Sequence, residues 1–473
     1  MMIGPPAPSV AERPGMRTVP PALLSALLAL FTVTGLLLAS IAAPGVALAV
    51  LPAAAALLIA LLFYEAPLLA VGLLVACYGL ALDIQLDNLA TQGAGSVGTL
   101  GAAVVKVIPF AIAAMLCIRF GFAPAINWPF LAFTLVAAVS LVVLPIGRVS
   151  TFGEMVRSFI GSTAPFVLAF AAAPRPVWSG LCKGIVLVPL ISAAAGLLVW
   201  PTGLYSAFDL NWRFQGLHSP PFLAGFCVTA VFAATLEYLR GFRMRWLVLG
   251  GAAIGVLLAT QARAPIIAVA VFLLLVFILS DRRTFPIKRK LDLAMGGLLP
   301  AAVLLGPLLI FAMDRFMGAD DTAQFSGRDV IWPYFLDAIE NRPLFGYGLG
   351  AGKLIVDPED PQIRLIRSNA AHNEYLRLSV DAGIIGCALI FASIIVWVWG
   401  GTRKVRATDR LVLRSALVAA LLHSGFDNTL IASTAVIQFS WFAAALARAR
   451  MERQDTRRQD VLREALARRA ASA

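Results

Sequence analysis

Long apolar runs separated by short polar segments fill most of the chain. A helix needs about 17 to 25 apolar residues to cross a bilayer, and this criterion marks about fourteen segments. Several are short or closely paired, so a count of about twelve or thirteen is an alternative. The segments lie near 20–43, 45–63, 66–82, 102–118, 128–145, 158–173, 178–199, 221–239, 246–261, 264–280, 291–312, 373–400, 411–425 and 429–447. The pattern predicts an all-α polytopic membrane protein.

Composition agrees with this pattern. The chain has 473 residues, of which 60% are hydrophobic and 14% charged, values outside the range of ordinary soluble domains. No early stretch combines a basic flank, a short apolar core and a small-residue cleavage site, so residues 1–19 are interpreted as a polar tail and not as a removed signal.

The placement of the charge predicts the orientation. A net charge of +12 would suggest nucleic acid as the partner of a soluble protein, but cytoplasmic loops of membrane proteins collect Lys and Arg. Alternating the sides of the spans puts most of the 38 Lys and Arg on the side of both termini, which predicts cytoplasmic termini and no nucleic-acid partner. The basic end of the chain is expected to be a solvated helix near anionic headgroups.

The resulting domain organisation has five parts. They are a cytoplasmic tail (1–19), a helix bundle (20–312), a large periplasmic loop (313–371), C-terminal transmembrane helices (372–447) and a basic cytoplasmic tail (448–473). The five cysteines are odd in number and all lie in or beside apolar runs, which predicts small buried hydrophobes and no disulfide or metal framework.

The large loop is too long for a simple connection and is expected to carry function. Within it, Ser326 and Asp329 resemble a capping box, and an apolar stripe of Ile331, Phe335 and Ala338 predicts a helix that ends at Pro343. Alternating glycines then lead to a lysine, but the sequence lacks the spacing and the Ser or Thr of a phosphate-binding P-loop. A tightly turning loop that allows close backbone approach is predicted instead.

Ionisable residues inside the spans fall near helix ends, which argues against a proton-coupled transporter with paired charges at the midplane. Polar residues instead gather on the outer face, where several separate loops could converge. The candidates there are Arg213, Arg263, Arg328, Arg364, Arg367 and His372.

Several arginines at one membrane surface favour an anionic ligand, because guanidinium binds phosphate oxygens through a planar fork. The alternative is that the arginines snorkel or pair with acids of the same loops, such as Asp357 and Glu359. Arg263 is harder to explain in that way, since its loop "TQARAP" contains no acid. An amphiphilic phosphate is the ligand expected from this pattern.

Two stretches, "FSGRDVIWPYFLDAIENRPLFGYGLGAGK" and "AHNEYLRLSVDAGIIG", resemble the signature region of the O-antigen ligase and polymerase family of bacterial envelope glycosyltransferases. The resemblance covers residues 326–386, with weaker matches at "WRFQGLHSPPFLAG" and "TQARAP". It implies a helical fold similar to the GT-C enzymes and transfer of a glycan, at the periplasmic face of the inner membrane, from an undecaprenyl diphosphate carrier. The acceptor would be the lipid A core in a ligase or another lipid-linked glycan in a polymerase.

By position in that family, His372 matches a catalytic histidine, while Arg328, Arg263 and Arg213 match arginines that hold the diphosphate. The chemistry agrees, because an imidazole with an unperturbed pKa of about 6.5 can accept a hydroxyl proton near neutral pH, and fixed arginines can stabilise a leaving diphosphate. The hypothesis is a metal-independent, inverting transfer without a cofactor. The alternative for His372 is helix capping.

The two other histidines fit less central roles. His218 is interpreted as a loop residue with a possible acceptor contact, and His423 with Asp427 as packing or as support for the site. Metal catalysis would need His beside the acidic pairs of "GADDTAQ" and "DPEDP", and neither pair has it. A lipid-carrier or polysaccharide transporter and a non-catalytic scaffold are the alternatives from other functional classes.

Overall fold

The computed structural model describes residues 64–89, 95–143, 151–203, 205–281, 286–288, 290, 327–357, 359–361, 363, 369–430 and 433–472. The chain divides into two compact units, 1–70 and 71–473, and of the first only residues 64–70 are described. The tail 1–19 and the predicted spans 20–43, 45–63 and 291–312 lie outside the described ranges.

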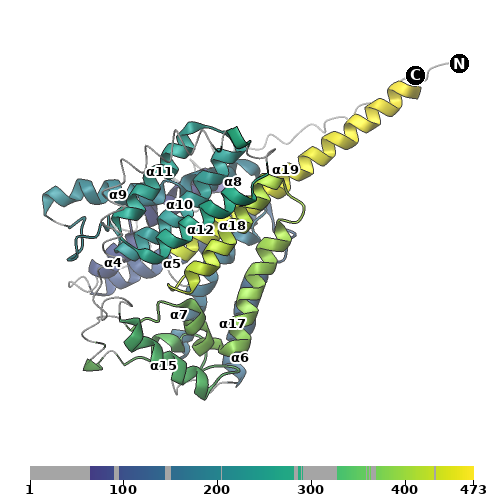
Figure 1. Cartoon of the computed structure of the whole chain (residues 1–473). Coiled ribbons are helices and arrows are strands. Elements are labelled where there is room, and N and C mark those ends of the chain that lie inside the picture. Colours follow the sequence, from purple (N-terminus) through teal and green to yellow (C-terminus); the bar gives the residue numbers. More distant parts are fainter. Residues whose placement is uncertain are drawn as a thin grey trace, which may run out of the picture. The chain divides into compact units, whose positions relative to one another are not determined.

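The described part of the chain is helical, and no strand forms in it beyond two isolated bridges, which confirms the predicted all-α class. The α-helices are α3 (Pro67–Gly79), α4 (Leu82–Leu89), α5 (Gly95–Phe120), α6 (Trp128–Val143), α7 (Phe152–Thr163), α8 (Arg175–Ile185), α9 (Val188–Val199), α10 (Pro220–Gly241), α11 (Met244–Ala259), α12 (Arg263–Leu279), α15 (Arg328–Asn341), α17 (Glu374–Gly401), α18 (Ala407–Ser424) and α19 (Ser433–Ser472) (Figure 1). Short 3₁₀ helices are η2 (Ala164–Phe170), η3 (Trp200–Thr202) and η5 (Ala351–Lys353).

Within the described residues, α10 and α17 are long and apolar enough to cross a membrane, and the bent pair formed by α8 with the segment Val188–Thr202 would add a third span. Helices α3, α6, α11 and α12 are apolar but shorter. Several apolar helices therefore stand where spans were predicted, while the number of spans remains a prediction.

Two predicted spans are not single α-helices. The span near 178–199 is broken between α8 and α9, which meet at 45°, and the span near 158–173 becomes α7 followed by the 3₁₀ helix η2. Pro189 and Pro165 stand in the first turn after each break. A proline ring collides with the carbonyl four residues earlier and lacks an N–H, so the α-helix stops there.

Of the two described helices long enough to cross a membrane, α10 is the more enclosed, with 83% of its most apolar 18 residues buried against 56% in α17. Helix α10 packs against α8, α9, α11, α12, α18 and α19 (Figure 1). At its C-terminal end, Arg240 donates to both carboxylate oxygens of Asp409 at 2.8 Å and to Glu452 at 2.9 Å. These bonds join α10 to α18 and α19.

All five cysteines are free and buried, as predicted.

Helix α17 is interrupted at Gly383, whose φ of 68° and ψ of 177° are not helical. The loop after α15 supplies the hydrogen bonds that the interruption removes from the helix. Tyr347 N–H donates to Val380 O at 2.9 Å, Gly348 N–H donates to Asp381 O at 2.9 Å, and Ile384 N–H donates to Pro343 O at 2.8 Å. The unpaired backbone groups of the broken helix are thereby satisfied.

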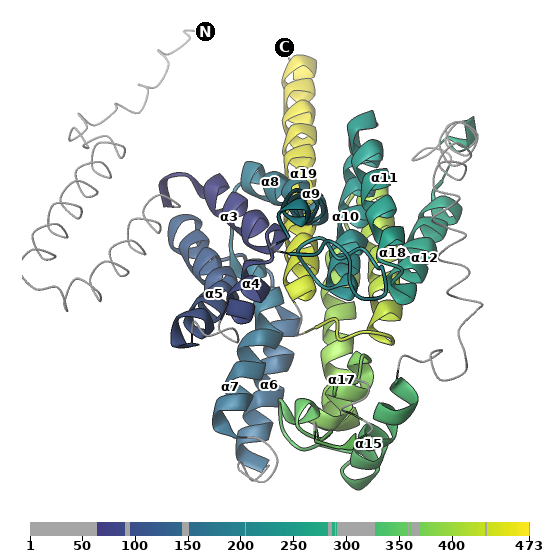
Figure 2. The ribbon, with the colours of Figure 1, turned by 90° about the vertical axis from the view of Figure 1, so that its left-hand side faces the viewer.

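The alternating glycines allow this close contact. A side chain at Gly346 would place its Cβ 2.3 Å from Val380 O, and one at Gly383 would place it 2.0 Å from Leu344 O. Both glycines also have positive φ, which is costly for other residues. The tightly turning loop predicted from the sequence therefore approaches α17, and its glycines are explained by that packing (Figure 2).

A buried charge cluster lies in the first half of α17. Arg377 is 2% exposed and forms ion pairs with Glu374 and, at 2.7 Å, with Asp381, both of which are fully buried. Asp381 also accepts the N–H of Gly352 at 2.7 Å. The cluster ties the loop to the half of α17 that begins next to His372.

Helix α15 confirms the predicted stripe, since Ile331, Phe335 and Ala338 are buried. The helix starts after Gly327, which makes no side-chain cap bond, while Ser326 of the predicted capping box lies outside the described residues. Figures 1 and 2 show α15 beside the N-terminal part of α17, where the site described below is formed.

Candidate functional site

His372 stands immediately before α17 in a strained conformation. Its φ of 45° lies in the left-handed region, which is uncommon for residues other than glycine. Both neighbours are fixed: Trp332 Nε1 donates to Ala371 O at 2.9 Å, and the Asn373 side chain caps α17 by accepting from Tyr375 N–H at 3.0 Å. Strain held in place by surrounding structure is typical of functional sites.

Asp427 lies between two histidines. Its Oδ1 is 3.7 Å from His372 Nδ1, and its Oδ2 is 3.8 Å from His423 Nε2. Burial would raise the pKa of the Asp427 carboxyl, but interactions with His372 and His423 outweigh this and hold the pKa below its usual value. The carboxylate is therefore ionised at neutral pH and lies close to a ring nitrogen of each imidazole.

The segment that carries Asp427 is held against α17. Tyr375 Oη donates to Leu421 O at 2.8 Å, and the hydroxyls of Ser424 and Thr429 are 2.6 Å apart. The His423 side chain is 4% exposed, and among the described residues neither of its ring nitrogens has a hydrogen-bond partner. His423 is therefore a buried neighbour of Asp427.

Two arginines approach the same place. Arg328, the first residue of α15, donates to Phe426 O at 2.8 Å, next to Asp427. Burial and the nearby charge of Arg263 lower the pKa of the Arg328 guanidinium although Asp427 acts in the opposite direction. Arginine stays protonated over any such shift, so Arg328 brings a positive charge next to the segment of Asp427, and the charge of Arg263 is close enough to act on Arg328.

Arg263 begins α12 after a second strained turn, in which Gln261 has a φ of 53°. His372, Arg328, Arg263, His423 and Asp427 thus come together from four parts of the sequence. The first three were predicted as site residues, and their roles stay predictions.

Arg213 is placed differently. Its guanidinium pairs with Asp209 in the same loop, with Nη2 at 2.6 Å and Nε at 2.7 Å from Oδ2. The adjoining Phe214 N–H donates to Ala259 O at 2.9 Å, so the loop packs against the end of α11, close in sequence to Arg263. Arg364 and Arg367 lie outside the described residues.

In the described ranges no group of three His, Cys, Asp or Glu side chains is arranged to hold a metal ion. The acidic pair of "GADDTAQ" lies outside those ranges, and in "DPEDP" Asp360 accepts the hydroxyl of Tyr334 at 2.7 Å.

His218 is a buried structural residue. It is 0% exposed, its Nδ1 is 2.8 Å from Ser192 Oγ, and its ring packs edge-on against Phe226. Burial lowers the pKa of His218 to about 3, although the backbone of Tyr78 acts in the opposite direction. The described contacts are those of packing and not of an acceptor site.

This burial predicts acid sensitivity. The folded pKa lies below the unfolded value of about 6.5, so as the pH falls the unfolded chain binds a proton first and stability is lost between about pH 6.5 and 3. At pH 5 the expected loss is about 2 kcal/mol. Thermal unfolding of the detergent-solubilised protein and of His218→Gln at pH 7.5 and 5 measures it. A variant as acid-sensitive as the parent would contradict the assignment.

The sequence did not identify Asp427 as the neighbour of His372. The only signal was its spacing of four residues from His423 in "HSGFDN". Asp427 and His372 are far apart in the sequence, so no local pattern indicates their contact. It forms only when α17 and α18 pack side by side.

Comparison with known families places these residues in context. The family model described as O-Antigen ligase matches residues 246–391, a range that contains Arg263, Arg328 and His372 and ends before His423 and Asp427. No curated protein matches the chain. The members of this family are glycosyltransferase-like enzymes. Residues 246–391 therefore form an O-antigen ligase family domain, which confirms the resemblance to the O-antigen ligase and polymerase family.

Proposed function

We propose that this protein is an inner-membrane ligase that transfers a glycan from an undecaprenyl diphosphate carrier to a sugar hydroxyl of the lipid A core, at the periplasmic face. The family domain and the apolar helices support an envelope glycosyltransferase in a membrane. The observation that carries the proposal is the grouping of His372, Asp427, Arg328 and Arg263 at one place.

In this proposal His372 is the general base. Its Nδ1 faces the Asp427 carboxylate, so Nε2 is the nitrogen that takes the proton of the acceptor hydroxyl. Asp427 fixes the ring orientation and stabilises the imidazolium that forms, as a carboxylate does in a catalytic triad. The hydroxyl oxygen then attacks the anomeric carbon, the bond to the diphosphate breaks, and the configuration inverts.

Arg328 and Arg263 bind the departing diphosphate in the proposal. Two guanidinium groups near one half-buried site supply the positive charge that the leaving group needs, in the role that a metal ion has in other transferases. Arg213 would join them only by releasing Asp209, so its part in diphosphate binding requires a rearrangement of its loop.

The test is transfer by purified protein in EDTA, with an undecaprenyl diphosphate-linked glycan as donor. Parallel reactions contain lipid A core or additional lipid-linked glycan as acceptor. Glycan joined to the core supports the ligase, whereas lengthened lipid-linked chains would identify a polymerase of the same family. An intact donor in both reactions, with donor movement across vesicles, would identify a transporter.

Asp427→Asn is expected to slow transfer by about 100-fold with little change in donor KM, because an amide neither stabilises an imidazolium nor sets the same ring tautomer. Steady-state kinetics of the variant measure the effect. Asn428→Ala, which alters the adjacent side chain, is the control and should retain activity within about threefold. Equal activity of Asp427→Asn and the parent would exclude the role of Asp427.

A further inference from the structure

A basic cavity of about 550 Å³ lies where the end of α17 meets α19 and the residues that precede α6. None of the described residues that line it is acidic. Its basic residues are Arg403 and Lys404 after α17, and Arg450, Arg453 and Arg457 on α19.

The three arginines of α19 share one helix face, since positions three and four apart lie on the same side of a helix. Glu452, which lies between Arg450 and Arg453 in the sequence, is already engaged by Arg240 and Arg175, each at 2.9 Å. Glu452 is 4% exposed, so it does not neutralise the cavity.

The described lining of the cavity offers no acid to balance its positive charge. Within the described ranges, no hydrogen bond or ion pair involves the side chains of the five basic residues. Arg403 and Lys404 can interact favourably with the C-terminal dipole of α17, but the arginines in the middle of α19 cannot. Burial lowers the pKa of Arg450, which means that its charge is partly withdrawn from water.

The other wall of the cavity is apolar and aromatic. Trp397 is buried, while Trp128, Ile126 and Val396 are about half exposed. Tryptophan is enriched where a membrane protein crosses the headgroup region. A ligand that fills both parts has a negatively charged head and a hydrocarbon body.

The cavity lies far from His372. It is at the C-terminal end of α17, whereas His372 precedes the first residue of that helix. The helix after the break at Gly383 is about 27 Å long by its rise per residue, close to the thickness of a hydrocarbon core of about 30 Å. The two sites therefore belong to opposite membrane surfaces.

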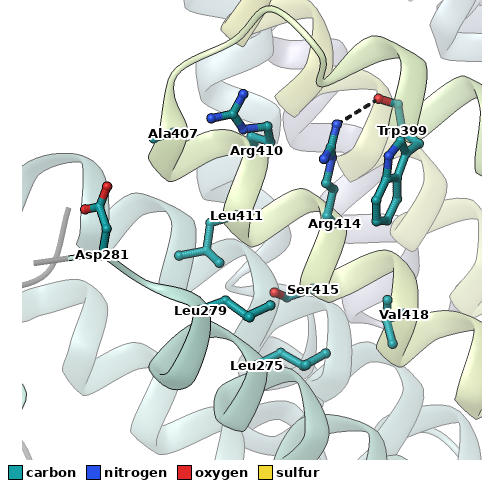
Figure 3. Close-up of a pocket in the computed structure, with 10 residues that line it drawn as sticks. All are labelled: Leu275, Leu279, Asp281, Trp399, Ala407, Arg410, Leu411, Arg414, Ser415 and Val418. Carbon is teal, nitrogen blue, oxygen red and sulfur yellow. Dashed lines mark hydrogen bonds between the residues drawn. The ribbon is translucent and has the colours of Figure 1, made fainter. Parts of the chain in front are cut away.

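A second cavity of about 330 Å³ beside the same end of α17 shows the contrast. There Arg414 lies over the Trp399 ring at 4.2 Å and donates to Trp399 O at 3.4 Å (Figure 3). Arg414 also donates to Thr402 Oγ1 at 3.0 Å, and the lining includes Asp281. Here Arg414 is bonded to protein groups and an acid, Asp281, stands in the lining with Arg410, whereas the described lining of the larger cavity holds five basic residues and no acid.

We infer that the larger cavity binds the phosphodiester headgroup of an anionic phospholipid, with the acyl chains along α6 and α17, at the membrane surface opposite His372. The guanidinium groups of the arginines on α19 donate to the phosphate oxygens, and Trp128 and Trp397 contact the glycerol and upper acyl region. The bound lipid joins α19 to the rest of the bundle.

The test is a titration of the full-length protein in neutral detergent with phosphatidylglycerol brominated on its acyl chains, which quenches nearby tryptophans. Brominated phosphatidylcholine reports non-specific quenching. Arg450→Gln with Arg453→Gln is expected to weaken phosphatidylglycerol binding by about 30-fold, since each basic residue near a surface contributes about fivefold.

The matched control is Arg463→Gln with Arg468→Gln, which removes the same charge from exposed positions farther along α19 and should change binding less than about threefold. If the first variant does not fold, Lys404→Gln with Arg457→Gln replaces it, because these side chains are exposed. Trp128→Phe should remove part of the quenched signal and so locate the lipid.

Three results would overturn the inference. One is equal binding of phosphatidylcholine, and another is an equal loss in the control variant, which would show an effect of overall charge. The third is displacement of the lipid by inorganic phosphate at millimolar concentration, which would show a site for the free anion.

Discussion

Replacing His372 by alanine is expected to reduce glycan transfer at least about 1,000-fold while leaving the protein folded, within the range that a general base contributes. His372 is 36% exposed, and its described ion-pair neighbour is Asp427 at 3.7 Å. Removal of the half-exposed ring therefore costs little packing energy. The measurement is the initial rate with purified variant and lipid-linked donor.

A second readout separates a base from a merely structural residue. Imidazole added to the His372→Ala variant should restore part of the rate, because the cavity left by the side chain can hold a free base beside Asp427. Glu340→Gln, an exposed change on α15, is the control and should transfer glycan at the parental rate. Near-normal transfer by His372→Ala, or no response to imidazole at any pH, would refute the assignment.

Arg377→Ala is expected to destabilise the protein by about 3–5 kcal/mol, the cost of leaving the partners of a buried ion pair without their counter-charge. Glu374 and Asp381 are both 0% exposed and would lose the guanidinium that lies between them. Because Glu374 is the first residue of α17, we also expect His372 to lose its position. Thermal unfolding in detergent and the transfer rate measure the two effects.

Arg157→Ala is the matched control for this change. Arg157 pairs with Glu154 at 3.6 Å in the same i,i+3 spacing as Arg377 and Glu374, but its side chain is 64% exposed. An exposed pair of this kind contributes about 0–1 kcal/mol. If Arg377→Ala unfolded within the same margin as Arg157→Ala, the buried cluster would have no part in holding the start of α17.

The sequence predicted what depends on local patterns. The apolar runs give α10, α11 and α12 with ends within a few residues of the predicted ones, because hydropathy and helix length are properties of one segment. The stripe of α15 follows from the same periodicity. Pro165 and Pro189 were visible as helix breakers, yet long apolar runs around them favoured single spans.

The parts that could not be predicted depend on contacts between distant segments. Gly383 stands in a helical apolar run and carries no local signal of a break, since glycine is common in membrane helices. The break is stable only because residues 343–348 supply its hydrogen bonds. The contact between His372 and Asp427 likewise exists only through packing, while the chemistry of the histidine and arginine side chains made Arg263, Arg328 and His372 candidates without it.

The interrupted helix sets a limit on how this protein can be recombined with its relatives. A chimera that exchanges only the loop before α17, cut at the polar boundary near residue 371, would separate Pro343, Tyr347 and Gly348 from the backbone groups that they complete in α17. Each side of such a junction would keep unsatisfied amides or carbonyls in an apolar setting. A functional exchange needs its downstream junction after Ile384. The loop and the half-helix to which it is hydrogen-bonded then come from the same protein.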